Sequence, residues 1–188
     1  MKLSFVALAA VALLSTASIQ SASAQKMKEK TVMVGGAAMY PSKNIVENAV
    51  NSKDHTTLVA AVKAAGLVET LSGPGPFTVF APTNAAFDAL PAGTVATLVK
   101  PENKATLTKI LTYHVVSGKM TASDLMKAIK KGGGKAELTT VQGEKLTAMM
   151  SGKSIEVKDT KGGIAMVTIA DVMQSNGVIH VVNKVLMP

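Results

Sequence analysis

The sequence contains no cysteine, no arginine and no tryptophan, and aromatic residues make up only 3% of its 188 residues. A chain without cysteine forms no disulfide, so the burial of apolar side chains must stabilise its fold. Recognition of nucleic acids relies on arginine forks and on aromatic rings that stack on bases. We therefore expect a protein with an ordinary apolar core that does not bind nucleic acid.

Catalytic and metal-binding patterns are also missing from the sequence. Its three histidines, His55, His114 and His180, lie far apart and form no HExxH motif, whereas a zinc site usually draws on ligands at short spacing. There is no Gly-x-Ser-x-Gly nucleophile turn and no phosphate-binding loop. The 11 methionines are scattered over apolar positions, which favours core packing over copper binding. We expect no enzymatic activity, no metal and no cofactor.

Residues 1–24 have the pattern of a signal peptide. Lys2 precedes the apolar run "LSFVALAAVALL", and the small residues "ASA" at 22–24 suit cleavage after Ala24. The apolar run is shorter than the roughly 20 residues that a membrane span needs, and no later segment has the pattern of a span. Residues 25–40 lack clear periodicity and are interpreted as a flexible leader. The pattern predicts an exported protein, either secreted, periplasmic or at the cell surface.

Basic residues outnumber acidic ones, with 20 lysines against 12 aspartates and glutamates and a formal net charge of +8. This excess favours attraction to anionic surfaces. The densest basic segment, "KAIKKGGGK", contains Lys127, Lys130, Lys131 and Lys135 at the end of a predicted helix. Lysines there also complement the helix dipole. The segment is therefore either a solvated helix end or a docking site for an acidic polysaccharide or another polyanion.

Helical patterns dominate the first part of residues 41–188, and strand patterns dominate the rest. Helical periodicity predicts helices within residues 42–50, 54–66, 84–90, 101–111 and 121–131. Strand patterns cover residues 77–81, 113–116, 136–141, 145–150, 154–159, 164–173 and 178–187, with Gly-containing turns between the later ones. The order predicts one α+β domain rather than alternating βαβ units.

Local signals mark several element ends. Thr121 and Asp124 have the spacing of a capping box, and Gly66 can end the second helix. Asp54 or Thr56 can cap the start of that helix. In "YHVV", read as a strand, alternation would send the side chains of residues 113 and 114 to opposite faces.

Three segments together resemble the fasciclin (FAS1) domain family. "FTVFAPTNAAFDALP" is similar to the first signature block, "LTYHVVSGK" to the central Tyr-His block, and "ADVMQSNGVIHVVNKVLMP" to the second signature block. The resemblance covers about residues 41–188. It implies a compact α+β fold, with a wedge of about seven β-strands flanked by several helices. It also implies a non-enzymatic adhesion or interaction module outside the cell that needs no metal.

The resemblance further implies a partner-binding site in some members of the family. The matching positions here are Tyr113 with His114 and Asp171 with Val172, where valine replaces the usual isoleucine of the second pair. A different reading makes His114 and His180 structural, because a buried histidine must find a hydrogen-bond partner. The turn at Asn176 and Gly177 would then organise the entry into the last strand.

We therefore expect an exported, monomeric adhesion module whose partner is a cell-surface or matrix protein or an acidic polysaccharide. A periplasmic carrier that binds a small apolar ligand or copper is the alternative, and a hydrolase is a weaker one. A closed core with an exposed lysine face would favour adhesion. An apolar pocket would favour the carrier, and a solvent-open serine or aspartate beside a histidine would favour the hydrolase.

Overall fold

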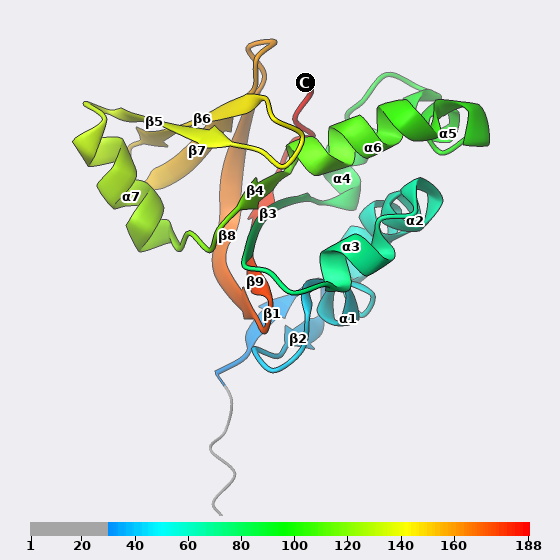
Figure 1. The fold of residues 1–188 in the computed structure, drawn as a ribbon, viewed down its shortest axis with the longest axis horizontal. Coiled ribbons are helices and arrows are strands. Elements are labelled where there is room, and N and C mark those ends of the chain that lie inside the picture. The colour runs from blue at the N-terminus through cyan, green and yellow to red at the C-terminus, as the bar shows by residue number, and fades with distance from the viewer. Residues whose placement is uncertain (1–29) are drawn as a thin grey trace, which may run out of the picture.

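The computed structural model describes residues 30–188, so the expected signal peptide and its cleavage site lie outside the described residues. The described helices all end by residue 131 and most strands follow them, as the sequence patterns predict, although two short strands precede the first helix (Figure 1). The α-helices are α1 (Ile45–Ala49), α2 (Thr56–Ala65), α3 (Val68–Ser72), α4 (Asn84–Asp88), α5 (Thr94–Leu98), α6 (Lys104–Tyr113) and α7 (Ala122–Lys131). Short 3-10 helices, Lys53–His55 and Pro101–Asn103, precede α2 and α6.

Seven strands form one sheet in the order β4-β3-β9-β8-β7-β6-β5. They are β3 (Phe77–Pro82), β4 (Val115–Ser117), β5 (Lys135–Thr139), β6 (Lys145–Ser151), β7 (Ser154–Lys158), β8 (Ile164–Gln174) and β9 (Gly177–Val182). All neighbours are antiparallel except β3 and β9, which run parallel. A bridge between Val116 and Thr140 joins the β4 edge to the chain just after β5, so the sheet nearly closes on itself. The predicted α+β class is confirmed.

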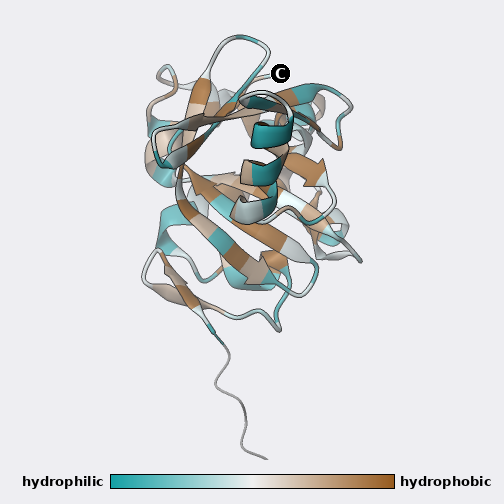
Figure 2. Cartoon of the chain, turned by 90° about the vertical axis from the view of Figure 1, so that its left-hand side faces the viewer, coloured by the Kyte–Doolittle hydropathy of each residue, from teal (hydrophilic) through white to brown (hydrophobic). Residues whose placement is uncertain are grey.

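Two hydrophobic clusters occupy the two sides of this sheet. The first lies between β3, β9 and the helices α1, α2 and α6, on the right of Figure 1, and it includes Leu107, Ile110 and Leu111 of α6. The second lies between α7 and the strands β5 to β8, where Leu125 and Ile129 are buried. Figure 2 faces α7 and shows its hydrophilic outer side over the apolar strands. The apolar face of the amphipathic helix α7 therefore covers the strands at one end of the wedge.

Two helix ends follow the local signals, and one does not. Thr121 and Asp124 form both bonds of the predicted capping box, and Gly66 ends α2 in the left-handed conformation, with φ 73°. The start of α2 is different, because neither Asp54 nor Thr56 caps it. Instead the side chain of Asn84, the first residue of α4, accepts a hydrogen bond from Thr57 N at 3.0 Å. A tertiary contact has replaced the predicted local cap.

The interpretation of residues 25–40 as a flexible leader is wrong for residues 32–39. They form an antiparallel hairpin of β1 (Val32–Val34) and β2 (Ala37–Met39). Gly35 and Gly36 make its turn with φ 57° and 77°, values that glycine adopts without strain. Val34 and Met39 are buried in the first cluster. Three-residue strands are too short to show a convincing alternation in the sequence.

The strand predicted at "YHVV" begins two residues later than expected. Tyr113 is the last residue of α6, and His114 caps its end, with the His114 N–H donating to Leu111 O at 3.1 Å. β4 starts at Val115. The α6 helix continues to the tyrosine, because each further helical residue adds a backbone hydrogen bond. The helical pattern also does not predict the short helices α3 and α5.

A polar cluster fastens the hairpin and α1 to the sheet. The Asn48 amide donates to Tyr40 O at 2.8 Å, and its oxygen accepts from Tyr40 N at 3.0 Å. The same amide also donates to the Gln174 side chain of β8.

Among residues 30–188, none of the helices combines the length and the hydropathy that crossing a membrane requires.

Candidate interaction surface

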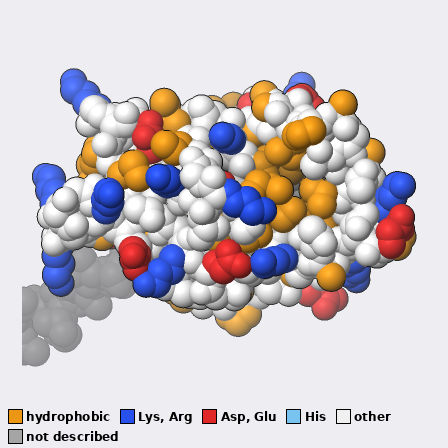
Figure 3. Space-filling model, turned by 90° about the horizontal axis from the view of Figure 1, so that it is seen from above, with side chains coloured by type: hydrophobic (Ala, Val, Ile, Leu, Met, Phe, Trp, Pro, Cys, Tyr) orange, Lys and Arg blue, Asp and Glu red, His pale blue; other side chains and the backbone are white. Residues whose placement is uncertain are grey.

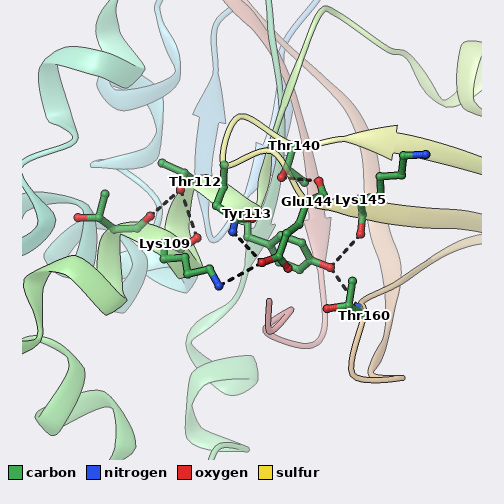
Figure 4. A network of polar contacts seen from close by, with 9 residues as sticks. Lys109, Thr112, Tyr113, Thr140, Glu144, Lys145 and Thr160 are labelled. Carbon is green, nitrogen blue, oxygen red and sulfur yellow. Dashed lines mark hydrogen bonds and ion pairs between the residues drawn. The ribbon is translucent and has the colours of Figure 1, made fainter.

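Tyr113 links three segments through its hydroxyl group. The hydroxyl donates to Lys145 O at 3.0 Å and accepts from Thr160 N at 3.1 Å (Figure 4). Its side chain is fully buried. Burial raises the pKa of Tyr113, so the phenol stays protonated and can donate. The end of α6 is thereby tied to β6 and to the turn between β7 and β8.

His114 is buried and uses both ring nitrogens. Nε2 accepts from Leu186 N at 2.9 Å, so the ring hydrogen lies on Nδ1, which donates to Ile110 O at 2.9 Å. Burial lowers the pKa of His114 to about 4, so the ring is neutral at pH 7. This geometry holds the chain after β9 against the end of α6. The chemistry is that of a structural crosslink, with no ring nitrogen left for a ligand.

His180 and Asp171 together hold the start of α7. His180 Nε2 lies 2.9 Å from Met120 O, and His180 Nδ1 accepts from Asp171 N at 3.3 Å. Asp171 Oδ1 accepts from Ala122 N, the first residue of α7, at 2.7 Å. Asp171 has φ 57°, a left-handed conformation that is uncommon for a residue with a side chain. His180 also stacks on Phe80, with ring centroids 5.7 Å apart.

The structure does not gather the two family-matched pairs on an exposed face. Tyr113, His114 and Val172 are each at most 3% exposed, and Val172 pairs with Ile179 inside the sheet. The fourth residue, Asp171, is partly exposed, but its carboxylate already binds α7. A partner could reach these side chains only if α7 or the chain end moved away. Partner binding at these pairs stays a prediction.

Ser175 and Asn176 form the tight turn from β8 into β9, and Gly177 is the first residue of β9. The Asn176 side chain accepts from Ile45 N at 3.0 Å and donates to Leu71 O at 2.8 Å and Gly73 O at 3.0 Å. It therefore connects the turn to α1 and α3. Gly177 lies against the Phe77 backbone, where the carbonyl oxygen leaves no space for a Cβ atom. A side chain at residue 177 would push β3 away from β9.

The four lysines singled out in the sequence are all exposed and lie on α7 and at the start of β5. Figure 3 shows lysine side chains gathered at its left end, the side on which α7 lies in Figure 1. Strand register adds a fifth lysine. Lys135 pairs with Met149 and Ser151 with Ser154, so the turn that carries Lys153 lies at the same end of the sheet. We call Lys127, Lys130, Lys131, Lys135 and Lys153 the lysine tip.

The charges of the lysine tip are largely uncompensated. Within the described part of the chain, the ion pairs are Lys109 with Glu144 and Lys145 with Glu137, and neither includes a tip lysine. Asp124 lies within electrostatic reach of Lys127, but the Thr121 hydroxyl and backbone already bind its carboxylate and lower its pKa. Lys153 is the residue that sequence reasoning missed. The Ser151-Gly152 turn signal, read with strand register, would have placed it at the same end of the sheet as Lys135.

The structure offers little to a hydrolase or a metal ion. Ser52 Oγ lies 2.9 Å from His55 Nδ1, but both side chains are at most 3% exposed. Residues 30–188 contain no group of three histidine, cysteine, aspartate or glutamate side chains placed to hold a metal ion. An apolar cavity of about 60 Å³ does lie beneath α2. An apolar cavity is the feature that the carrier alternative requires.

Comparison with known proteins gives relatives along most of the chain. Protein sll1483 of Synechocystis sp. is 51% identical over 162 residues, which cover 85% of this chain and 82% of that protein. Immunogenic protein MPB70 of Mycobacterium bovis is 37% identical over 145 residues, covering 74% and 66%. Transforming growth factor-beta-induced protein ig-h3 of Sus scrofa is 41% identical over 131 residues, which cover 70% of this chain and 17% of that much longer protein.

A solved structure shares the fold. A FAS1 domain pair from the insect cell adhesion molecule Fasciclin I matches with a TM-score of 0.69 at 16% identity, covering 86% of this chain and 59% of that chain. This likeness confirms the predicted wedge of strands flanked by helices. In sequence, the fasciclin domain model matches residues 53–188. With these relatives, the match shows that the chain belongs to the fasciclin domain family.

Proposed function

We propose that this chain is an exported, non-enzymatic adhesion module that acts as a monomer and binds an acidic polysaccharide through its lysine tip. The family supports an interaction role, since its members include an insect cell adhesion molecule. The observation that carries the proposal is the gathering of five exposed lysines, from α7, β5 and the β6–β7 turn, at one end of the domain.

The residue types at the tip favour a polysaccharide over a nucleic acid. Lysine is a compact and strongly hydrated charge, which suits loose attraction to carboxylate or sulfate groups more than bidentate base recognition. The sequence has no arginine, and the tip has no aromatic ring on which a base could stack. A flexible polyanion can instead contact several separate lysines at once, and their small contributions add.

Neutralising the tip tests the proposal. The variant replaces all five tip lysines by glutamine, and the control replaces Lys30, Lys53, Lys100, Lys104 and Lys184, which are exposed elsewhere. Both lose the same charge. If each exposed contact contributes roughly 0.3–0.5 kcal/mol, binding of the tip variant to immobilised heparin or alginate should weaken roughly tenfold or more. The control variant should stay within about threefold of the unmodified protein.

Salt dependence and the family-matched pair complete the test. Exposed charges are screened over about 8 Å at physiological ionic strength, so salt should weaken binding by the unmodified protein more steeply than binding by the tip variant. Asp171→Asn should bind normally. Equal binding by the tip and control variants, or a loss confined to Asp171→Asn, would contradict the assignment of the tip.

A further inference from the structure

The cavity beneath α2 is enclosed almost entirely by apolar side chains. It lies between α2 and the strands β3 and β9, and the β1–β2 hairpin contributes Val34 and Met39 to its lining. Its volume of about 60 Å³ exceeds the roughly 10–15 Å³ that a single water requires. Water gains few hydrogen bonds from such walls, so the space suits a hydrocarbon group.

The cavity follows one face of α2 and of the 3-10 residue just before it. The lining residues from this segment are His55, Leu58, Val59, Val62 and Lys63, the spacing of a single helix face. At a rise of 1.5 Å per residue, His55 and Lys63 are about 12 Å apart along the helix. The lining therefore extends along α2 from His55 to Lys63, and nearly all of the surface that it presents is apolar.

The exposed lining residues show where the cavity opens. Most of the lining is buried, and the residues that are not buried are Val46, Ala49, Val59, Lys63 and Val68. These come from α1, α2 and the start of α3, so the mouth lies among these three helices. Lys63 is the charged residue of the lining, and no acidic side chain of the described residues lines the cavity with it.

The closed end of the cavity carries neutral imidazoles. Burial lowers the pKa of His55 and of His114, so neither ring is charged at pH 7. His114 has both nitrogens bonded. His55 Nδ1 bonds Ser52 Oγ, while His55 Nε2 is buried without a hydrogen bond of good geometry, although the Ala81 carbonyl lies near the ring. A charged ligand group is thus favoured only at the mouth.

We propose that this cavity binds an unbranched carboxylate of short to medium length, such as hexanoate. The hydrocarbon chain lies along α2, and the carboxylate stays at the mouth beside the Lys63 ammonium. Each methylene group that leaves water raises a binding constant about fourfold. A carboxylate deep in the cavity would lose its hydration without a compensating charge. This site gives the carrier alternative a ligand class, and it is independent of the lysine tip.

Titration of the full-length mature protein with hexanoate tests the site. Isothermal titration calorimetry should show saturable binding, and Lys63→Gln should weaken it roughly threefold to fivefold. 1-Hexanol, which has the same chain without the charge, should bind Lys63→Gln and the unmodified protein equally. Lys153→Gln, which removes a tip lysine and the same net charge, should leave the binding of both ligands unchanged.

A second variant tests the cavity itself. Ala49→Phe places a large ring at the mouth and should abolish binding of hexanoate and hexanol while the unfolding midpoint shows a folded protein. Non-saturable binding of hexanoate overturns the proposal, and so does equal weakening by Lys63→Gln and Lys153→Gln. Because the lysine-tip variant keeps the cavity, it should bind hexanoate normally, so failure of one proposal is distinguishable from failure of the other.

Discussion

His114 shows how a single buried residue couples this fold to pH. Its Nε2 accepts from Leu186 N, and its Nδ1 donates to Ile110 O. A proton added to Nε2 would face the Leu186 N–H and place a charge among apolar side chains. Burial holds the pKa of His114 at about 4, below its ordinary value of 6.5. Burial lowers the pKa of His55 and His180 in the same direction.

We expect stability to fall as the pH drops from 6.5 towards 4. In this window His114 is protonated in the unfolded chain but stays neutral in the folded protein. The contribution of neutral His114 to the free energy of unfolding is therefore complete above pH 6.5 and is lost near pH 4. The contribution of His114 is on the order of 3 kcal/mol. Urea unfolding at pH 7 and pH 4.5 measures it. His114→Gln, which cannot titrate, should show a smaller pH effect, and an equal effect in both proteins would exclude this role.

At the scale of elements, α7 depends on contacts that lie outside its own sequence. Thr121 and Asp124 cap its first turn locally. Asp171, which interrupts β8 at a bulge, satisfies a further N–H of that turn, and His180 holds the Met120 carbonyl just before it. The left-handed backbone of Asp171 aims its carboxylate at the helix, where a negative charge also complements the dipole.

Three substitutions at Asp171 should separate the cap from the backbone strain. Asp171→Asn keeps an acceptor and tolerates φ 57°, so it should cost less than about 1 kcal/mol. Asp171→Gly loses the cap without strain, and Asp171→Ala loses the cap and adds about 1 kcal/mol of strain. The expected order of stability is therefore Asn, then Gly, then Ala. Chemical denaturation measures this order, and an alanine variant as stable as the glycine variant would show that the conformation at 171 is not strained.

At the scale of the whole molecule, two apolar clusters on either side of one sheet account for the stability of the described residues. The chain has no cysteine. Residues 30–188 hold no metal-ligand group. The two proposed sites lie apart on the molecule. The lysine tip lies at one end, and the cavity opens among the helices on the other side of the sheet.

We expect thermal unfolding to be independent of metal chelation. Apolar burial does not require a cation, so the unfolding midpoints with and without EDTA should coincide within experimental error. Addition of zinc after chelation provides the control and should leave the midpoint unchanged. A midpoint that falls with EDTA and recovers with zinc would show that histidines or carboxylates hold a structural metal.

The sequence by itself determined the features that arise within a few residues along the chain. The capping box of α7, the left-handed Gly66 and the apolar stripe of α6 each depend on side chains one or two turns apart. Their spacing is visible in the sequence because a helix repeats every 3.6 residues. The α+β order of the elements and the three family blocks are likewise visible in the sequence alone.

Only the tertiary structure decided which distant groups meet. Asn84 caps α2 from the start of α4, β3 pairs in parallel with β9, and strand register brings Lys153 to the same end of the sheet as Lys135. The cavity beneath α2 also depends on how α1, α3 and the sheet pack around one helix face. These contacts depend on long-range packing, because the energy of each contact depends on partners that lie far away in the sequence. A local sequence pattern therefore does not predict them.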